Sequence, residues 1–487
     1  MKRTEYVSCW MAIPVLCPIV YGYAQNSPNV LIIHTDEHNF RTLGCYRSLL
    51  TQDQAEVWGK DVVVETPNID FLATHGVICE RFYATTPVSS PSRSSFMTGL
   101  YPQQTGVVTN DIPMNDTVVT FAEDFRRSGY HTGYLGKWHL DGTARPGWHP
   151  NRKFGFEDNR YMMNRGHYKR IVENSDGKLD ITYEGKGLTP ENFMTDFLTD
   201  KAIDYIRNHQ KDKFCCVISY PDPHGPNIVR SPYDTMYTHL NFQLPKTALK
   251  NKDGLPSWAF GNDQMENMAR YFGMVKCLDD NVGRLLRELK DCDLLEHTII
   301  VFTSDHGDLC GEHGRTNKSV PLEASARVPF IIYYPEELQQ GKVVKEVLSV
   351  VDFAPTILSL AGIKTTAFRA GRDFTILLKG KEPDNKWRDA VFMRGGDNLE
   401  GPAKSWISVV SKRYKLTLSD RPGDKPWLTD LVNDPDELIN EYDNPSYRNI
   451  LRKLMDELYD YGQQWKDKRL ESPLIKKEMN EIVKSVN

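Results

Sequence analysis

The sequence predicts an α/β protein built on a mostly parallel sheet. Four short apolar runs without polar alternation are typical of central parallel strands, which are buried on both faces. They occupy residues 29–35 (NVLIIHT), 131–136, 214–219 (FCCVIS) and 298–303 (TIIVFT). Segments with helix-spaced apolar residues separate these strands, at 120–128, 191–209 and 263–290. Strands that alternate with helices in this way indicate an α/β fold.

Each of the four predicted strands ends in ionisable residues. The side chains that follow the strands, in chain order, are Asp36 and Glu37, Lys137 and His139, Asp222 and His224, and Asp305 and His306. The carboxyl ends of parallel strands lie along one edge of a sheet, where ligands bind. We therefore expect these side chains to meet in a single crevice.

The C-terminal part reads as a smaller unit. After a further apolar run at 327–334 and a helix that stops at Gly362, short strands at 390–393, 406–410 and 414–418 predict an antiparallel sheet. A helix at 447–464 follows, and the charged tail after Leu470 is expected to be loosely held. We divide the chain into a leader (1–24), a catalytic α/β domain (25–365) and a C-terminal subdomain (366–487).

The N-terminus reads as a secretory signal. Lys2 and Arg3 precede an apolar run at 7–21, and small residues favour cleavage near Ala24. Cys17 leaves a surface lipoprotein open as the alternative, although Leu16 stands where such sites need a small residue. No later segment is long and apolar enough for a transmembrane helix. We expect a periplasmic or secreted protein.

Composition restricts the function. The formal net charge of −5 gives no field that would attract nucleic acid, so any bound anion must be held by local cations. The nine cysteines show no CxxC spacing, which argues against a zinc ribbon and a disulfide framework.

The stretch at 86–106 (TPVSSPSRSSFMTGLYPQQTG) carries the main motif. Ser90 fits an N-cap and Pro91 the first turn of a helix, which places Ser89 at an electropositive helix N-terminus. Arg93, one turn inside, is a guanidinium fork suited to a tetrahedral oxyanion. The alternative is a Ser/Pro-rich turn that merely caps a short helix.

This stretch resembles the signature of the formylglycine-dependent sulfatases, with Ser89 as the residue that is oxidised. A second signature of that family resembles residues 129–132 (GYHT) and 136–139 (GKWH). Two motifs in this order make chance agreement very improbable. The chain is therefore similar to bacterial carbohydrate sulfatases of the alkaline phosphatase superfamily. The resemblance implies a large mixed, mostly parallel sheet between helices, with a small C-terminal α+β subdomain.

The resemblance also implies a metal site. The implied ligands are Asp36, Glu37, Asp305 and His306, with the modified Ser89 facing the ion. Glu37 departs from the family pattern, in which aspartate is commoner. Oxygen donors favour one Ca²⁺ ion, while the nitrogen of His306 keeps Mn²⁺ or Zn²⁺ open.

The implied catalytic residues are Ser89, Arg93, Lys137, His139, His224 and Lys318. A hydroxyl of the hydrated aldehyde attacks sulfur, and preorganised cations meet the charge that develops. His224, with Lys318, is the expected acid for the leaving oxygen. His139 takes the proton whose loss expels sulfate. A serine precursor implies a cytoplasmic formylglycine-generating maturation enzyme as a transient partner.

The sequence gives fewer indications of the residues that determine substrate specificity than of the catalytic residues. The region 145–183 is rich in Arg, His and aromatic residues, and is either a substrate loop or an exposed connector. Possible substrate contacts are Arg41, His167, Arg315 and Arg394.

The expected function is hydrolysis of O-sulfate on a carbohydrate, acting on a terminal sugar of a host or algal glycan. The alternatives are a phosphonate or phosphate monoester hydrolase of the same superfamily, an N-sulfoglucosamine sulfohydrolase, and a glycan-binding protein without activity.

Overall fold

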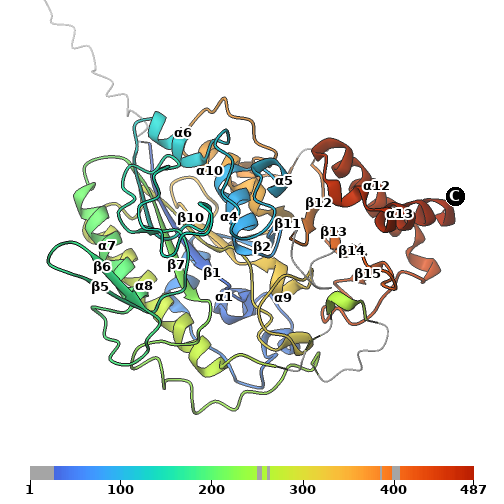
Figure 1. The fold of residues 1–487 in the computed structure, drawn as a ribbon, viewed down its shortest axis with the longest axis horizontal. Coiled ribbons are helices and arrows are strands. Elements are labelled where there is room, and N and C mark those ends of the chain that lie inside the picture. Colours follow the sequence, from blue (N-terminus) through green and yellow to red (C-terminus); the bar gives the residue numbers. More distant parts are fainter. Residues whose placement is uncertain are drawn as a thin grey trace, which may run out of the picture.

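The central sheet has nine strands, and its order is β11-β2-β10-β8-β1-β7-β3-β4, with β9 paired to β2 (Figure 1). The structure is a computed structural model that describes residues 27–248, 255–259, 261, 264–383, 387–396 and 406–486. The strands are β1 (Asn29–Asp36), β2 (Val77–Tyr83), β3 (His131–Lys137), β4 (Met162–Met163), β7 (Phe214–Pro223), β8 (Thr298–Ser304), β9 (Arg327–Val328), β10 (Phe330–Tyr333) and β11 (Lys342–Ser349). The proposed leader, its cleavage near Ala24 and Cys17 lie outside the described residues.

The middle of this sheet is parallel, as predicted. β1 lies between β7 and β8, and β3 lies beyond β7, all four running in the same direction. β10 is the exception, since it pairs antiparallel with both β8 and β2. The predicted run at 327–334 is split by Pro329 into β9 and β10. The prediction of a mixed, mostly parallel sheet is confirmed.

Helices cover both faces of the sheet, and β1 shows why its sequence is apolar throughout. Val30 and Ile32 pack on the face covered by α4 (Ser89–Thr98), α6 (Phe121–Arg127), α10 (Phe353–Leu360) and α11 (Thr375–Leu378). Leu31 and Ile33 pack on the other face, under α3 (Pro67–His75), α7 (Met194–Asn208) and α8 (Met268–Asp291). A strand buried on both sides needs apolar residues at every position. Short helices α1 (Gly44–Arg47), α2 (Gln52–Ala55), α5 (Pro102–Thr105) and α9 (Glu323–Ala326) lie in the connections.

The C-terminal part forms the expected antiparallel sheet, in the order β12-β13-β14-β15. Its strands are β12 (Ala390–Arg394), β13 (Trp406–Ser411), β14 (Tyr414–Ser419) and β15 (Trp427–Asp430). β12 adjoins β11 of the large sheet, so this part sits at one side of the molecule, in orange to red in Figure 1. The boundary at 365/366 stays a prediction.

The tail after Leu470 is not loosely held, which corrects the prediction. It forms helix α13 (Pro473–Val486), which pairs with α12 (Arg448–Trp465). Ile475 and Ile482 are buried in the apolar core of the C-terminal part. The prediction was wrong because it rested on the many charged residues of this segment. The two buried isoleucines lie seven positions apart, which places them on one face of a helix.

Within the described residues, no helix has the length and apolarity that a membrane span requires. The seven cysteines of this part of the chain are all free.

The region 145–183, predicted as a substrate loop or an exposed connector, has secondary structure of its own. It contains β4 at the sheet edge and a two-stranded hairpin of β5 (Arg170–Glu173) and β6 (Leu179–Thr182). The segment between β4 and β5 carries His167, which the next section places in the site.

Candidate active site

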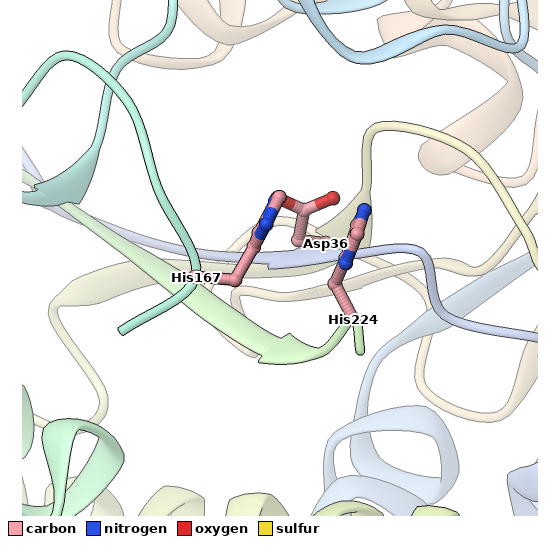
Figure 2. Close-up of side chains that lie close together, drawn as sticks. All are labelled: Asp36, His167 and His224. Atoms are coloured by element: carbon pink, nitrogen blue, oxygen red, sulfur yellow. The ribbon is translucent and has the colours of Figure 1, made fainter. Parts of the chain in front are cut away.

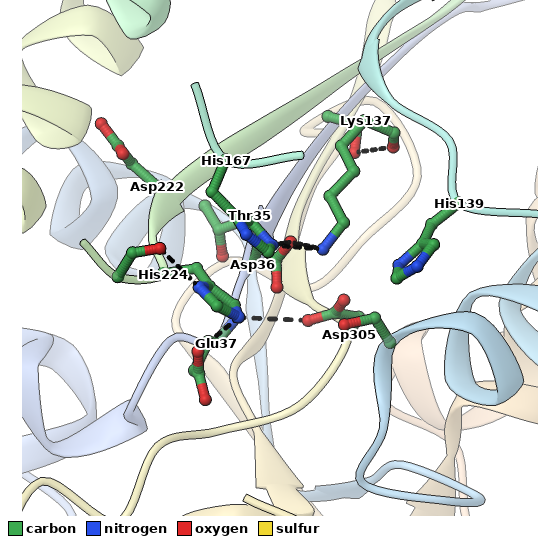
Figure 3. A network of polar contacts seen from close by, with 12 residues as sticks. Thr35, Asp36, Glu37, Lys137, His139, His167, Asp222, His224 and Asp305 are labelled. Atoms are coloured by element: carbon green, nitrogen blue, oxygen red, sulfur yellow. Dashed lines mark hydrogen bonds and ion pairs between the residues drawn. The ribbon is translucent and has the colours of Figure 1, made fainter. Parts of the chain in front are cut away.

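The carboxyl ends of β1, β3, β7 and β8 bring the predicted polar residues together, as Figure 3 shows. Asp36 closes β1 and Lys137 closes β3, while His224 follows β7 and Asp305 follows β8. All four strands run in parallel, so their ends open on the same edge. The topology of the sheet, and not any one motif, brings these side chains together.

Ser89 is the first residue of helix α4, with Val88 as the N-cap. The prediction of Ser90 as the cap and Pro91 at the first position is therefore wrong by two residues. A proline is still tolerated there, because the first-turn N–H groups have no partners inside the helix. Ser89 itself is 2% exposed, and its Oγ lies 3.0 Å from Nε2 of His306. The Ser89 hydroxyl thus faces the site from the positive end of a fully buried helix.

Arg93 links the four strands β1, β3, β7 and β8. Its Nε donates to Asp305 Oδ2 at 2.8 Å, and its Nη1 donates to the Lys137 carbonyl (2.8 Å) and to Ser219 Oγ (2.7 Å). The remaining Nη2 lies 3.4 Å from Asp36 Oδ2. Burial opposes the charged form, but Asp305 and Asp36 outweigh it and raise the pKa of Arg93. In this structure the guanidinium fork is directed to the protein's own carboxylates.

Asp36, Asp305 and His306 form a buried group whose donor atoms all lie within 4.8 Å of one another. Oδ1 of Asp36 has no hydrogen-bond partner among the described residues. Burying a carboxylate oxygen without a hydrogen-bond partner costs free energy, unless a bound cation interacts with that oxygen. Two carboxylates and an imidazole suit a divalent cation. The residues present therefore fit the metal that the resemblance implies.

The structure does not place the Glu37 carboxylate in that group. Oε1 of Glu37 pairs with Lys318 Nζ and Oε2 with His224 Nε2, each at 2.9 Å. Lys318 Nζ and His224 Nε2 are themselves 2.8 Å apart. Burial would raise the pKa of Glu37, but His224 and Lys318 overcome it and lower that pKa to about 2. Glu37 thus binds the two groups expected to protonate the leaving oxygen.

His167, predicted only as a substrate contact, lies at the centre of the site. Its ring stacks on His224 with centroids 3.5 Å apart and 7° between the planes. Its Nε2 lies 2.7 Å from Lys137 Nζ (Figure 3). The same nitrogen lies 3.5 Å from Asp36 Oδ2, and Figure 2 shows Asp36 with the two histidine rings. Lys137 also binds Asp36 directly. The inserted segment thus contributes a side chain to the group at the strand ends.

Lys169 fixes that inserted segment, and the sequence did not single it out. Its side chain is fully buried and binds Asp222 Oδ1 (2.5 Å) and the His224 carbonyl (3.0 Å). The second oxygen of Asp222 accepts from Thr195 Oγ1 at 2.6 Å. The DPH sequence at 222–224 was a usable signal for the acceptor, but nothing nearby indicated its lysine.

His139 follows the end of β3 and is 4% exposed. Its Nε2 lies 3.4 Å from Oδ1 of Asp111, whose other oxygen pairs with Arg165 at 2.7 Å. Sequence reasoning missed Asp111, because it lies in a loop without a motif.

Two of the predicted substrate contacts are not supported. Arg41 is 2% exposed and pairs with Glu312 at 3.0 Å, and Arg394 is 3% exposed and pairs with Asp467 at 2.6 Å. Both arginines are committed to ion pairs inside the protein, so their charge is not available to a substrate. Arg315 is partly exposed on the segment that leads to Lys318 and stays a candidate.

Comparison with known proteins agrees with this geometry. Residues 28–363 match the Sulfatase family model, and residues 311–464 match the model for the C-terminal region of N-sulphoglucosamine sulphohydrolase. An N-acetylglucosamine-6-O-sulfatase of Bacteroides thetaiotaomicron is 26% identical, over 90% of this chain and 87% of its own length. An ulvan-active sulfatase of Formosa agariphila is 28% identical, over 91% of this chain and 83% of its own length.

Solved structures share the fold. One bound to its substrate D-glucosamine-2-N,6-O-disulfate has a TM-score of 0.74 at 23% identity, with 91% of this chain and 98% of that chain covered. A phosphonate monoester hydrolase from Silicibacter pomeroyi has a TM-score of 0.71 at 23% identity, with 91% of this chain and 96% of that chain covered. The Sulfatase model matches residues 28–363, which is most of the chain, and the ends of the parallel strands gather the predicted polar side chains into one buried group. This chain therefore belongs to the sulfatase family and is a sulfuric ester hydrolase.

Proposed function

We propose that the protein removes O-sulfate from a terminal sugar of a sulfated glycan, through a formylglycine made from Ser89. The observation that carries the proposal is the placement of Ser89, at the start of a buried helix and 3.0 Å from His306. The relatives named for N-acetylglucosamine-6-O- and ulvan sulfate support a carbohydrate substrate.

Asp36, Asp305 and His306 would hold one divalent cation, with Ca²⁺ as our first choice. The cation and the hydrated aldehyde would together supply an activated oxygen nucleophile at neutral pH. The ammonium groups of Lys137 and Lys318 lie beside Asp36 and Glu37, within the group of side chains at the strand ends, and would meet negative charge that develops on the transferred group.

His224 is suited to protonate the leaving oxygen. Its Nδ1 faces the Gly225 carbonyl at 2.8 Å, and a carbonyl only accepts, so Nδ1 carries a hydrogen. Nε2 is then the atom that gains and loses a proton, and it faces Lys318 and Glu37. His139 would accept the proton whose removal expels sulfate.

Export and maturation extend the proposal. A signal cleaved near Ala24 would carry the protein to the periplasm or beyond, after a cytoplasmic enzyme has oxidised Ser89. The motif at 89–93 and the charged-then-apolar leader at 2–21 support these steps.

The test is sulfate release by matured protein whose aldehyde has been confirmed by mass, with Ca²⁺ and a panel of defined sulfated saccharides. Ser89→Ala should release no sulfate, whereas Ser48→Ala, which alters an exposed serine, should match the wild type. Sulfate release by Ser89→Ala would refute the proposal.

Two other activities have specific support. The structural neighbours include phosphonate monoester hydrolases, so matched phosphonate esters belong in the panel. The match of residues 311–464 to the N-sulphoglucosamine sulphohydrolase C-terminal model favours including N-sulfated glucosamine. Turnover of either one in place of O-sulfate would transfer the assignment to it.

A further inference from the structure

We propose that Asp111 is a positioning residue that fixes the tautomer of His139, leaving Nδ1 of the ring free to accept a proton. The inference rests on the proposed function for the role of His139, but the contact itself is a property of the fold. Three features of Asp111, of His139 and of the loop at 107–118 support it.

The first feature is the contact between the two side chains. Nε2 of His139 faces Asp111 Oδ1 at 3.4 Å, while Nδ1 is buried without a partner among the described residues. An ionised carboxylate only accepts hydrogen bonds, so the imidazole nitrogen that faces it must carry the hydrogen. The other nitrogen, Nδ1, then keeps its lone pair.

The second feature is the neutral state of the ring. Burial, with Lys137 acting in the same direction, lowers the pKa of His139 to about 3. A neutral imidazole has one hydrogen and two possible tautomers, and the hydrogen bond at one nitrogen selects between them. Asp111 is the acceptor that makes this selection here.

The third feature is the set of contacts that hold Asp111 and its loop against neighbouring segments. Oδ2 of Asp111 pairs with Arg165 Nη1 at 2.7 Å. On one side of Asp111, the Asn110 side chain accepts from the backbone N–H of Ser90 at 3.0 Å. On the other side, Met114 N–H donates to the Leu140 carbonyl at 3.0 Å. The loop is thus tied to the helix that begins at Ser89 and to the segment that carries His139.

The backbone conformations of Asp111 and His139 support the same proposal. Asp111 has φ 68° and His139 has φ 62°, in the left-handed region that non-glycine residues rarely adopt. Such conformations persist where the surrounding structure fixes them, and they are common at active sites.

The step served by this arrangement is the release of sulfate from the sulfated hydrate. The proton of the second hydroxyl goes to Nδ1 of His139, and the O–H electron pair becomes the second bond of the aldehyde C=O. The bond from carbon to the sulfate oxygen breaks, and its electron pair leaves with sulfate. A ring with hydrogen on Nδ1 could not accept that proton.

Asp111→Asn is the decisive variant. Asparagine has the shape of aspartate and tolerates the left-handed region, so the loop keeps its conformation. Its amide can present N–H to Nε2 and so favour the opposite tautomer. Asp116→Asn is the matched control, since Asp116 lies in the same loop and its side chain is 92% exposed.

The first measurement uses the full chain with unmodified Ser89 and needs no activity. Long-range ¹⁵N–¹H spectra of histidine-labelled protein should show His139, assigned by its loss in His139→Gln, with hydrogen on Nε2. In Asp111→Asn the hydrogen should move to Nδ1, and in Asp116→Asn it should stay. An unchanged tautomer in Asp111→Asn overturns the proposal.

The second measurement uses the matured enzyme. Asp111→Asn should lower kcat about 10- to 100-fold, with KM changed less than about threefold, as expected for a group that acts on the reaction step. A kcat equal to that of Asp116→Asn overturns the proposal. If the wild type releases no sulfate at all, the proposed function fails, and the tautomer experiment still decides the inference.

Discussion

The ring of His167 lies flat on the ring of His224, with centroids 3.5 Å apart and planes 7° from parallel. One ring comes from the inserted segment between β4 and β5, and the other follows the end of β7. Two imidazolium rings at this distance would repel each other, so the stack favours at most one charged ring. The contact couples the inserted segment to the expected acid.

His167→Phe should separate stacking from polar contact. Phenylalanine can keep the ring contact with His224 but loses the 2.7 Å contact with Lys137. Loss of one hydrogen bond to a charged group is worth about 1.5–3 kcal/mol, so we expect kcat/KM to fall roughly 10- to 100-fold. His167→Ala also loses the stack, so its kcat/KM should fall further in the same assay. Equal values for the two variants would show that stacking contributes nothing.

Glu37→Gln should leave cation binding intact and slow turnover. The Glu37 carboxylate is directed to Lys318 and His224 and not to the group of Asp36, Asp305 and His306. Calorimetric titration with Ca²⁺ should therefore show one site in Glu37→Gln and none in Asp305→Asn. Loss of the site in both variants would instead make Glu37 a ligand.

Glu437→Gln should change how stability depends on pH. Glu437 and Glu323 share Lys415, at 2.6 and 2.9 Å, inside the protein. Burial, reinforced by Glu323, raises the pKa of Glu437 to about 7. A raised carboxyl pKa means that the fold favours the protonated form. The contribution of Glu437 to the free energy of unfolding therefore falls as pH rises from about 4.5 to about 7.

The contribution of Glu323 to the free energy of unfolding depends on pH with the opposite sign. Burial would raise its pKa, but Lys415 and Arg327 lower it to about 2, so its contribution is lost only as pH falls from about 4.5 to 2.

Urea unfolding at pH 5, 6, 7 and 8 measures the effect of Glu437. Over this range the free energy of unfolding should fall less steeply in Glu437→Gln than in the wild type. One proton accounts for at most about 1.4 kcal/mol per pH unit. Glu184→Gln, at an exposed position, is the control, and parallel wild-type and Glu437→Gln curves would contradict the prediction.

Lys169→Met should destabilise the protein, because it leaves Asp222 buried without its cation. Breaking a buried ion pair on one side costs about 3–5 kcal/mol. The double variant with Asp222→Asn should recover part of this loss. Urea unfolding of the unmatured chain measures both values, and strictly additive losses would show that the two residues are not coupled.

Ile475→Ala should lower stability by about 2–4 kcal/mol, because it opens a cavity between α13 and the rest of the C-terminal core. Val483→Ala on the same helix, at a position that is 48% exposed, should change it by less than about 0.5 kcal/mol. Equal and small effects would mean that the tail is loosely held after all.

Much of the site was predictable because it lies at strand ends. Asp36, Lys137, His224 and Asp305 each follow an apolar run, and the parallel topology that the helix–strand alternation predicts places such ends on one edge. Ser89 was predictable from its motif, although the helix begins two residues earlier than the cap pattern indicated, because Val88 supplies the N-cap.

The sequence by itself determined the α/β class, the family and the residues at the strand ends, since these depend on local apolar patterns and short motifs. Only the tertiary structure decided which cations lie among the side chains at the strand ends. It buried Arg41 and Arg394 in ion pairs, turned Glu37 to Lys318, and brought Asp111, His167 and Lys169 in from loops. Such contacts join residues far apart in the chain, and their partners depend on which loops the fold brings together, which no local pattern records.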